Sequence, residues 1–364
     1  MSSTARDTIA VGTVQDITDA VRSAVKDQKT LTAARHVIGT TRQLDLSAMN
    51  RVVDYPARDM TVTVEAGVTL RILYDLLRTE GQQLPVDVAD PDMTIGAFVA
   101  SDLAGPRQYG YGTLRDYLIG MEAVDGQGRV FHAGGRVVKN VAGYDLCRLM
   151  VGSRGSLGIL SQVTFKLKPI PEQFLVQRWQ FARETEVTAS LDSLNQSAAR
   201  PVVIDLQSSD SLTWSLCVGV DGPPAVCDWQ MKRLHQEMSN PVSSEILAAN
   251  NTTATVYCED VARRHLAPDT VGVVRTVPSR VTDVCCLMHK FGLVAVCHAG
   301  NGVVVVCHGD SESLPDQGIE QIQELLSETQ GCFRSATDDT TLRRPQNPFS
   351  TGLVEVFDPN HLFV

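Results

Sequence analysis

Two glycine-rich stretches are the parts of this sequence most able to bind a ligand through the backbone. The later one, "GGRVVKNVAGYDLCRLMVGSRGSLGIL", runs from Gly134 to Leu160 and spaces Gly152, Gly155 and Gly158 as G-x-x-G-x-x-G. Because glycine has no Cβ, its backbone N–H groups can closely approach an anion or a planar ring. This spacing is not the dinucleotide fingerprint G-x-G-x-x-G, and neither that fingerprint nor a P-loop occurs elsewhere in the chain. The pattern therefore disfavours a nicotinamide-binding Rossmann fold.

The earlier stretch, "PDMTIGAFVASDLAGPRQYGYGTLRDYLIG", carries a second group of such residues: Thr94, Gly96, Gly105, Gly110 and Gly112. Taken alone, either stretch is also compatible with tight turns and a bulged strand. Two such stretches in one chain are harder to explain by turns, and they favour a site built from main-chain groups.

The cysteine and histidine residues give weaker evidence for a functional site than the glycines do. The nine cysteines include no C-x-x-C pair, which argues against an iron–sulfur cluster held by this chain and against a disulfide framework. His298 and His308 could start a metal site, but zinc needs a third protein ligand and none suggests itself. We therefore expect no metal, and we interpret His298 as a strand-end histidine in a turn. No constellation of catalytic side chains stands out.

Composition excludes several classes of protein. The chain has 364 residues, 43% hydrophobic and 20% charged, with a net charge of -10, as is typical of a folded globular protein. This acidity disfavours a broad nucleic-acid surface. No stretch approaches the roughly 20 apolar residues that span a bilayer, and the first residues lack the apolar core of a signal peptide. We expect no transmembrane segment and a cytoplasmic location.

Periodicity indicates the elements that position the glycines. Apolar residues at helical spacing predict helices over 14–25 and 69–81, and β-branched alternation predicts a strand over 61–68. Asp125-Gly126 between two apolar runs predicts a hairpin. A further strand precedes the prolines that follow Leu167.

The Pro169-x-Pro171 pair is the clearest domain boundary. Beyond it, strands and helices follow in β-α-β-β order with short connections, which predicts an antiparallel sheet with helices on one face. We predict a first domain of residues 1–172, completed by a C-terminal tail of residues 320–364, and an inserted α+β cap domain of residues 173–319.

The two glycine stretches, "AGPRQYGYGTLRDYLIG" and "GGRVVKNVAGYDLCRLMVGSRGSLGIL", resemble the FAD-binding domain of the vanillyl-alcohol oxidase and p-cresol methylhydroxylase superfamily. They are most similar to the glycolate oxidase E-subunit group. The similarity is strong from about Leu44 to Pro171, weak through the second domain, and resumes at "VFDPNHLF". It implies an α+β fold, with a two-subdomain FAD-binding domain of the p-cresol methylhydroxylase type and an inserted antiparallel α+β cap domain.

In that family FAD lies extended between two subdomains and is held largely by main-chain groups. The resemblance implies a phosphate-side loop, a wall beside the cofactor, and a loop beneath it. The matching residues are, in that order, Thr94 and Gly96; Gly105, Tyr109 and Gly110; and Gly152, Gly155, Gly158 and Ile159. A family signature without an assigned role falls on Lys139, Asn140, Gly143 and Tyr144.

The resemblance implies an FAD-dependent oxidoreductase subunit, a flavoprotein that oxidises a small 2-hydroxy acid such as glycolate by hydride transfer to the flavin. The alternative is a non-catalytic or electron-relaying subunit with weakened or lost FAD binding. The partners implied are a catalytic flavoprotein subunit and an iron–sulfur subunit.

Three departures from the family pattern support the alternative. The first phosphate loop is short, with only Gly39-Thr40-Thr41, and one glycine supplies few of the N–H donors that a pyrophosphate needs. Ala97 follows Gly96 where the family has a second glycine. "CHAGNG" is similar to the family's "HAGDGNLH", but Asn301 replaces the aspartate and Val305 stands at the second histidine. We expect the chain alone to hold FAD weakly or not at all.

Overall fold

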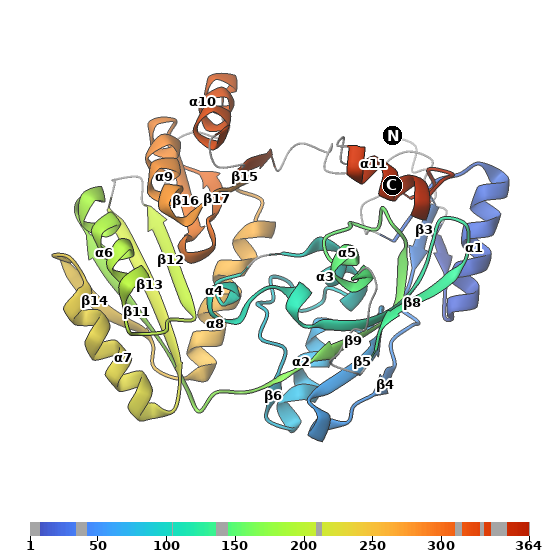
Figure 1. The fold of residues 1–364 in the computed structure, drawn as a ribbon, viewed down its shortest axis with the longest axis horizontal. Coiled ribbons are helices and arrows are strands. Elements are labelled where there is room, and N and C mark those ends of the chain that lie inside the picture. Colours follow the sequence, from blue (N-terminus) through green and yellow to red (C-terminus); the bar gives the residue numbers. More distant parts are fainter. Residues whose placement is uncertain are drawn as a thin grey trace.

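The computed structural model describes residues 8–33, 42–103, 105–135, 145–208, 213–309, 315–327, 331–335 and 348–363. Their helices and strands form two lobes (Figure 1), and each lobe has its own hydrophobic core. The first lobe contains the N-terminal half of the chain and the last helix, so the chain returns to it at its end. The second lobe, which we call the cap, contains the intervening residues.

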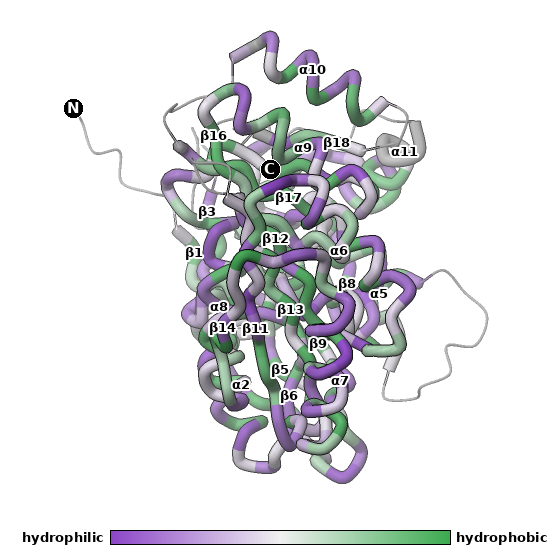
Figure 2. The backbone as a smooth tube through the Cα atoms, turned by 90° about the vertical axis from the view of Figure 1, so that its left-hand side faces the viewer, coloured by the Kyte–Doolittle hydropathy of each residue, from purple (hydrophilic) through white to green (hydrophobic). Residues whose placement is uncertain are grey.

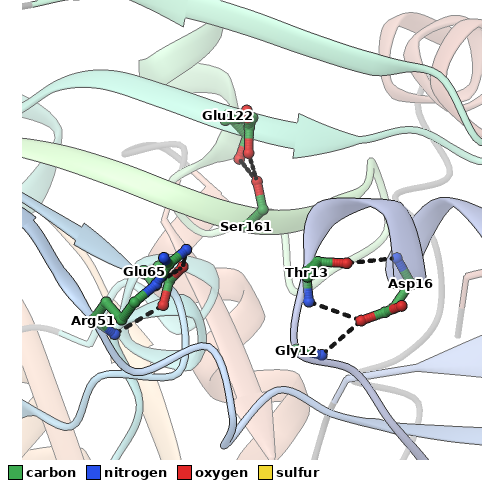
Figure 3. Close-up of polar contacts among 7 residues, drawn as sticks. All are labelled: Gly12, Thr13, Asp16, Arg51, Glu65, Glu122 and Ser161. Carbon is green, nitrogen blue, oxygen red and sulfur yellow. Dashed lines mark hydrogen bonds and ion pairs between the residues drawn. The ribbon is translucent and has the colours of Figure 1, made fainter.

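The first lobe opens with a small parallel sheet in the order β1-β3-β2. Its elements are β1 (Thr8–Ala10), α1 (Val14–Asp27), β2 (Leu31–Thr32) and β3 (Arg42–Asp45). Helix α1 begins with a capping box, in which Thr13 Oγ1 accepts from the Asp16 N–H and Asp16 accepts from the Thr13 N–H (Figure 3). The helix predicted over 14–25 is thus confirmed.

A five-stranded antiparallel sheet in the order β4-β5-β9-β7-β8 forms the centre of the first lobe. Its strands are β4 (Val52–Asp54), β5 (Thr61–Glu65), β7 (Leu118–Val124), β8 (Val130–Gly134) and β9 (Ile159–Lys166). The predicted hairpin is the β7–β8 pair, where Asp125 accepts from the Gln127 and Arg129 N–H groups. The predicted strand over 61–68 ends earlier, at Glu65, because Gly67 lies in a turn.

Short elements surround this sheet. The helices are α2 (Leu70–Thr79), α3 (Ile95–Ser101), α4 (Gln108–Tyr111) and α5 (Leu146–Met150), with 3₁₀ turns η1 (Ala57–Asp59) and η2 (Leu114–Asp116). Strand β6 (Gln82–Gln83) pairs with β10 (Lys168–Pro169) at the end of the first lobe. The predicted helix over 69–81 is α2, and Thr69 caps its N-terminus.

The cap is built on an eight-stranded antiparallel sheet in the order β14-β11-β13-β12-β16-β17-β15-β18. The strands are β11 (Gln173–Phe181), β12 (Val203–Ser208), β13 (Trp214–Gly222), β14 (Ser243–Ala248), β15 (Thr270–Arg275), β16 (Leu293–His298), β17 (Val303–His308) and β18 (Cys332–Ser335). Strands β12 and β13 run through the interior as largely hydrophobic segments (Figure 2).

Helices cover both faces of the cap sheet. Helices α6 (Glu184–Gln196), α7 (Pro224–Glu237), α9 (Val281–Lys290) and α10 (Asp316–Ser327) contribute to the main core on one face. Helix α8 (Asn251–Arg263) packs with Ala254 and Cys258 on the other face, together with Val203 and Cys217. It lies between the lobes in Figure 1, so the prediction of helices on one face holds for only part of the cap. The 3₁₀ turns are η3 (Arg264–Leu266), η4 (Pro278–Arg280) and η5 (Ala299–Asn301).

The structure and the predicted domain boundaries differ at one place. Strands β5 and β11 lie in different sheets, on opposite sides of Pro169-x-Pro171. The predicted end of the cap at residue 319, however, falls inside α10, and β18 still pairs with β15. The chain returns to the first lobe only with α11 (Pro348–Phe357), because apolar residues of α10 complete the core of the cap. The division into an FAD domain and a cap domain remains a prediction.

Among the described helices, none combines the length and the apolar character that crossing a lipid bilayer requires.

Candidate functional site

The loop of residues 151–158 lies against the C-terminal end of α3. The Gly152 N–H donates to Val99 O at 3.0 Å, and the Arg154 N–H donates to Ala100 O at 3.0 Å. Gly152, Arg154 and Gly155 all have left-handed φ angles, of +78°, +55° and +78°. Because left-handed backbone is costly for residues with a Cβ, glycine suits the first and third of these positions.

This loop has the properties expected of a backbone site for an anion or a flavin. The N–H groups of Gly155, Leu157 and Gly158 donate to no acceptor among the described residues. A Cβ built on Gly155 meets no atom within 4 Å, so the space beside it is open. Ser153 also has a buried hydroxyl without a hydrogen-bond partner in the described part of the chain. The donors and the open space fit a bound FAD.

Two other residues of this predicted group contribute to packing. A Cβ on Gly158 would lie 2.9 Å from Val124 O, so glycine is needed there for the close approach of two chain segments. Ile159 is the first residue of β9, and its buried side chain belongs to the small core beneath α1. Whether either residue contacts the cofactor remains a prediction.

Thr94 and Gly96 lie at the opposite, N-terminal end of α3. Thr94 caps the helix by accepting from the Ala97 N–H. The Gly96 N–H donates to Ala66 O at 2.8 Å, and a Cβ on Gly96 would lie 3.1 Å from Ala66 Cβ. The Gly96 donor is therefore already used within the protein.

Gly105 belongs to a segment anchored in the first lobe by a buried ion pair. Arg107 Nε donates to Asp87 Oδ1 at 2.6 Å, and the two side chains are 7% and 1% exposed. The Arg107 N–H also donates to Asp87, and Arg107 Nη1 donates to Gln83. A Cβ on Gly105 would lie 2.4 Å from Asp87 Cβ, so this carboxylate requires glycine at position 105.

The same segment then contacts the cap. The Gly110 N–H donates to Val202 O at 3.2 Å, and a Cβ on Gly110 would lie 2.5 Å from Val202 Cα. The Tyr109 ring packs on Gly300, where an added Cβ would meet ring atoms at 2.3 Å. The Tyr111 hydroxyl donates to Asp221. Residues 105–112 therefore join the two lobes, and Gly105 and Gly110 are needed for this contact whether or not a cofactor is bound.

Two polar contacts lie at the five-stranded sheet (Figure 3). The Arg51 side chain and N–H both donate to the Glu65 carboxylate, at 2.6 to 3.0 Å. On the neighbouring strands, the Ser161 hydroxyl donates to the Glu122 carboxylate. Burial raises the pKa of Glu65, but the bonds from Arg51 outweigh burial and leave this pKa below its ordinary value.

A second polar cluster lies inside the cap, and sequence analysis identified only one of its members. His298 Nδ1 is 3.0 Å from Asp205 Oδ1, and the Tyr257 hydroxyl donates to Asp205 Oδ2 at 3.0 Å. His265 Nε2 is 3.1 Å from His298 Nε2. Asp205 could have been noticed as a charged residue inside the apolar run "PVVIDLQ". Nothing in the sequence connects Tyr257 and His265 to it.

His298 and His308 do not approach each other. His298 pairs with Val303 and His308 pairs with Leu293, so the two histidines are at opposite ends of the β16–β17 hairpin. Val305 is buried in the middle of β17. The described residues assemble no group of three or more potential metal ligands. The signature residues Lys139, Asn140, Gly143 and Tyr144 and the short loop at Gly39, Thr40 and Thr41 lie outside the described residues.

Comparison with known proteins supports the flavin interpretation. Residues 7–134 match the family model described as FAD binding domain. Glycolate oxidase subunit GlcE of Escherichia coli is 35% identical over 191 residues, which are 52% of this chain and 53% of that protein. Glycolate oxidase subunit GlcD of Bacillus subtilis is 38% identical over 125 residues, which are 34% of this chain and 27% of that protein.

The fold is similar to that of alkyldihydroxyacetonephosphate synthase, with a TM-score of 0.70, 15% identity, and coverage of 98% of this chain and 75% of the synthase chain. At this identity the likeness concerns the fold alone, and it agrees with the predicted α+β class. The match spans about half the length of the E. coli relative. Residues 7–134 are therefore similar to an FAD binding domain, which agrees with the flavin expected from the glycine motifs.

Proposed function

We propose that this protein is an FAD-dependent oxidoreductase subunit that oxidises a small 2-hydroxy acid such as glycolate. The observation that carries the proposal is the 151–158 loop, where the N–H groups of Gly155, Leu157 and Gly158 donate to no acceptor in the described part of the chain and Gly155 faces open space. The loop comes shortly after residues 7–134, which match an FAD binding domain. Backbone donors in such a loop suit a cofactor with both negative charge and a planar ring.

The bound flavin would supply the hydride-accepting chemistry. The task of this chain would be to hold and orient that group and to exclude water. The Gly155, Leu157 and Gly158 N–H groups would bind it from the first lobe. Residues 105–112 would hold the cap in place, because they bond to Asp87 on one side and to Val202 and Asp221 on the other.

The relatives support this class of substrate. They include two glycolate oxidase subunits and several D-lactate dehydrogenases, whose named substrates each carry a hydroxyl next to a carboxylate. Since GlcE and GlcD are both named as subunits of glycolate oxidase, we also propose that this chain acts in a complex with a catalytic flavoprotein subunit and an iron–sulfur subunit.

The second candidate function is an electron-relaying or structural subunit with weakened FAD binding. It is favoured by the N-terminus of α3, where the Gly96 N–H already donates to Ala66 O and the Ile95 N–H donates to Val68 O. With these donors used, fewer groups remain for a pyrophosphate, and burying its charge without partners is costly.

Anaerobic spectroscopy separates the two candidates. The chain is purified alone and together with its co-expressed partner subunits, and the visible flavin absorbance is followed as glycolate or D-lactate is added. The first candidate predicts bleaching of the flavin by 2-hydroxy acids and none by acetate or propionate, which lack the hydroxyl. A flavin attributable to this chain that no 2-hydroxy acid bleaches, either alone or in the complex, would favour the second candidate.

A further inference from the structure

Four side chains form a continuous hydrogen-bonded chain inside the cap, in the order Tyr257, Asp205, His298, His265. Asp205 and His298 are 0% and 1% exposed, so neither contacts water in this structure. The two imidazole rings stack with centroids 5.3 Å apart. These residues come from three separate segments of the chain: α8 with η3, strand β12, and strand β16.

With Asp205 ionised, the hydrogen bonds determine where the protons lie. An ionised Asp205 accepts from the Tyr257 hydroxyl and from His298 Nδ1–H. In neutral His298 the facing Nε2 then carries a lone pair, so the 3.1 Å contact requires a proton on His265 Nε2. Neutral His265 must therefore have its free lone pair on Nδ1. Nδ1 of His265 is therefore the ring nitrogen through which the four hydrogen-bonded side chains can take up a proton.

The surroundings disfavour charge on His265. Burial, the neighbouring His298 and the nearby Arg275 lower the pKa of His265 to about 3. His298 instead bonds directly to the Asp205 carboxylate. Burial raises the pKa of Asp205, while the bonds from His298 and Tyr257 oppose this, and Asp87 of the first lobe adds a like charge.

Other groups near the cluster carry no charge that competes for the proton. On β13, burial raises the pKa of the Cys217 thiol to about 12, so this thiol stays neutral. The Arg107 guanidinium faces Asp87 in the first lobe and is paired with it. Asp205 is therefore the carboxylate that bonds to His298, and His265 joins the cluster through its bond to His298.

The cluster lies close to the contact between the lobes. His298 directly precedes η5, and two residues later Gly300 packs against Tyr109 of the 105–112 segment. That segment is the predicted wall beside the cofactor.

We propose that His265 and His298 form a proton relay that accepts the hydroxyl proton released when the substrate alcohol is oxidised. The proposal rests on the proposed function. Oxidation of the alcohol to a carbonyl breaks the C–H and O–H bonds; a bound flavin would supply the acceptor for the hydride, and the proton would leave to the protein. His265 Nδ1 binds that proton, and His265 passes its Nε2 proton to His298 Nε2. His298 becomes an imidazolium beside Asp205, and His265 stays neutral with its proton moved to Nδ1. Asp205 and Tyr257 position the relay.

Nitrogen NMR of the protein labelled at histidine tests this without any substrate. As the pH falls, the relay predicts that His298 gains a proton while His265 changes from the Nε2–H to the Nδ1–H tautomer at the same midpoint. Asp205→Asn keeps the side-chain size but removes the counter-charge, and should lower the proton affinity of the pair tenfold or more. Tyr257→Phe should shift the same midpoint by a smaller amount. This variant provides the test if Asp205→Asn fails to fold.

The matched control is His235→Gln, another cap histidine, which bonds to Gln177 instead of a carboxylate and should leave the tautomer change unaltered. If His265 and His298 titrate independently, or if the midpoint is the same in wild type, Asp205→Asn and Tyr257→Phe, the relay is wrong. If the linked tautomer change is found but no 2-hydroxy acid is oxidised, the two histidines are coupled as argued, but the proposed function fails and with it the substrate hydroxyl as the source of the proton.

Discussion

The substitution Gly155→Val is the sharpest test of the loop proposed to hold the flavin. Gly155 has a φ of +78° and its added Cβ meets nothing within 4 Å, so valine clashes with no atom of the protein. Gly81 provides a matched control, because it has a φ of +65° and equally open surroundings at the end of α2. Each substitution places a β-branched residue in left-handed backbone and should cost about 1–2 kcal/mol of stability.

The two variants should differ in flavin binding. A side chain at position 155 enters the space beside the unused N–H groups and blocks hydrogen bonds to an anionic group, each of which contributes about 1.5–3 kcal/mol. The loss of two such bonds amounts to about 3 kcal/mol or more, which is roughly a 100-fold weaker affinity for FAD. Gly81→Val should leave this affinity unchanged.

The assay combines FAD titration, followed by flavin fluorescence, with urea unfolding of each variant. Urea unfolding shows that the two variants have lost similar stability, so that a difference in FAD affinity reports on the loop. Equal FAD affinities for Gly155→Val and Gly81→Val would refute the assignment of the 151–158 loop to the cofactor.

Three further predictions test the packing and the charges. Arg107→Met leaves the Asp87 carboxylate buried without the guanidinium that pairs with it, and should lower the free energy of unfolding by about 3–5 kcal/mol. A loss below about 1 kcal/mol, measured by urea unfolding, would contradict a buried ion pair. The pKa of Glu65 is lowered in the folded protein, so its contribution to the free energy of unfolding is complete above the unfolded pKa near 4.3 and is lost as pH falls through the folded pKa. Glu65→Gln should remove this part of the acid destabilisation. An unchanged pH dependence of the melting temperature in that variant would argue against it. Cys332 is the only exposed cysteine among the described residues, so an aromatic disulfide reagent should label one thiol rapidly and Cys332→Ser should abolish that phase. Persistence of the phase would mean that another cysteine is accessible.

Local elements of this fold could be predicted because their causes are local in the sequence. Helix α1 follows from apolar residues at helical spacing and from the Thr13–Asp16 capping box. The β7–β8 hairpin follows from Asp125 and its turn. The backbone freedom of Gly152 and Gly155 could likewise be inferred, because both have left-handed φ angles that favour glycine, whereas their contact with the cofactor stays a prediction.

Long-range contacts could not be predicted in this way. Asp205 and His298 meet because β12 pairs with β16, strands that are 93 residues apart at this contact, and periodicity does not specify strand order. The same applies to β18, whose pairing with β15 keeps the chain in the cap beyond the predicted boundary. Gly105 and Gly110 matched a cofactor motif, but the packing that requires them is long-range. Gly105 packs against Asp87 within the first lobe, and Gly110 packs against Val202 of the cap.

Calorimetric titration of the flavin-free chain with FAD tests the central claim most directly, because the claim is that this chain itself holds the cofactor. The account predicts saturable binding of one FAD per chain, weak enough to be reversed by dialysis, since the Gly96 N–H is already used within the protein. The absence of saturable FAD binding, for the chain alone and for the chain with its partner subunits, would contradict it.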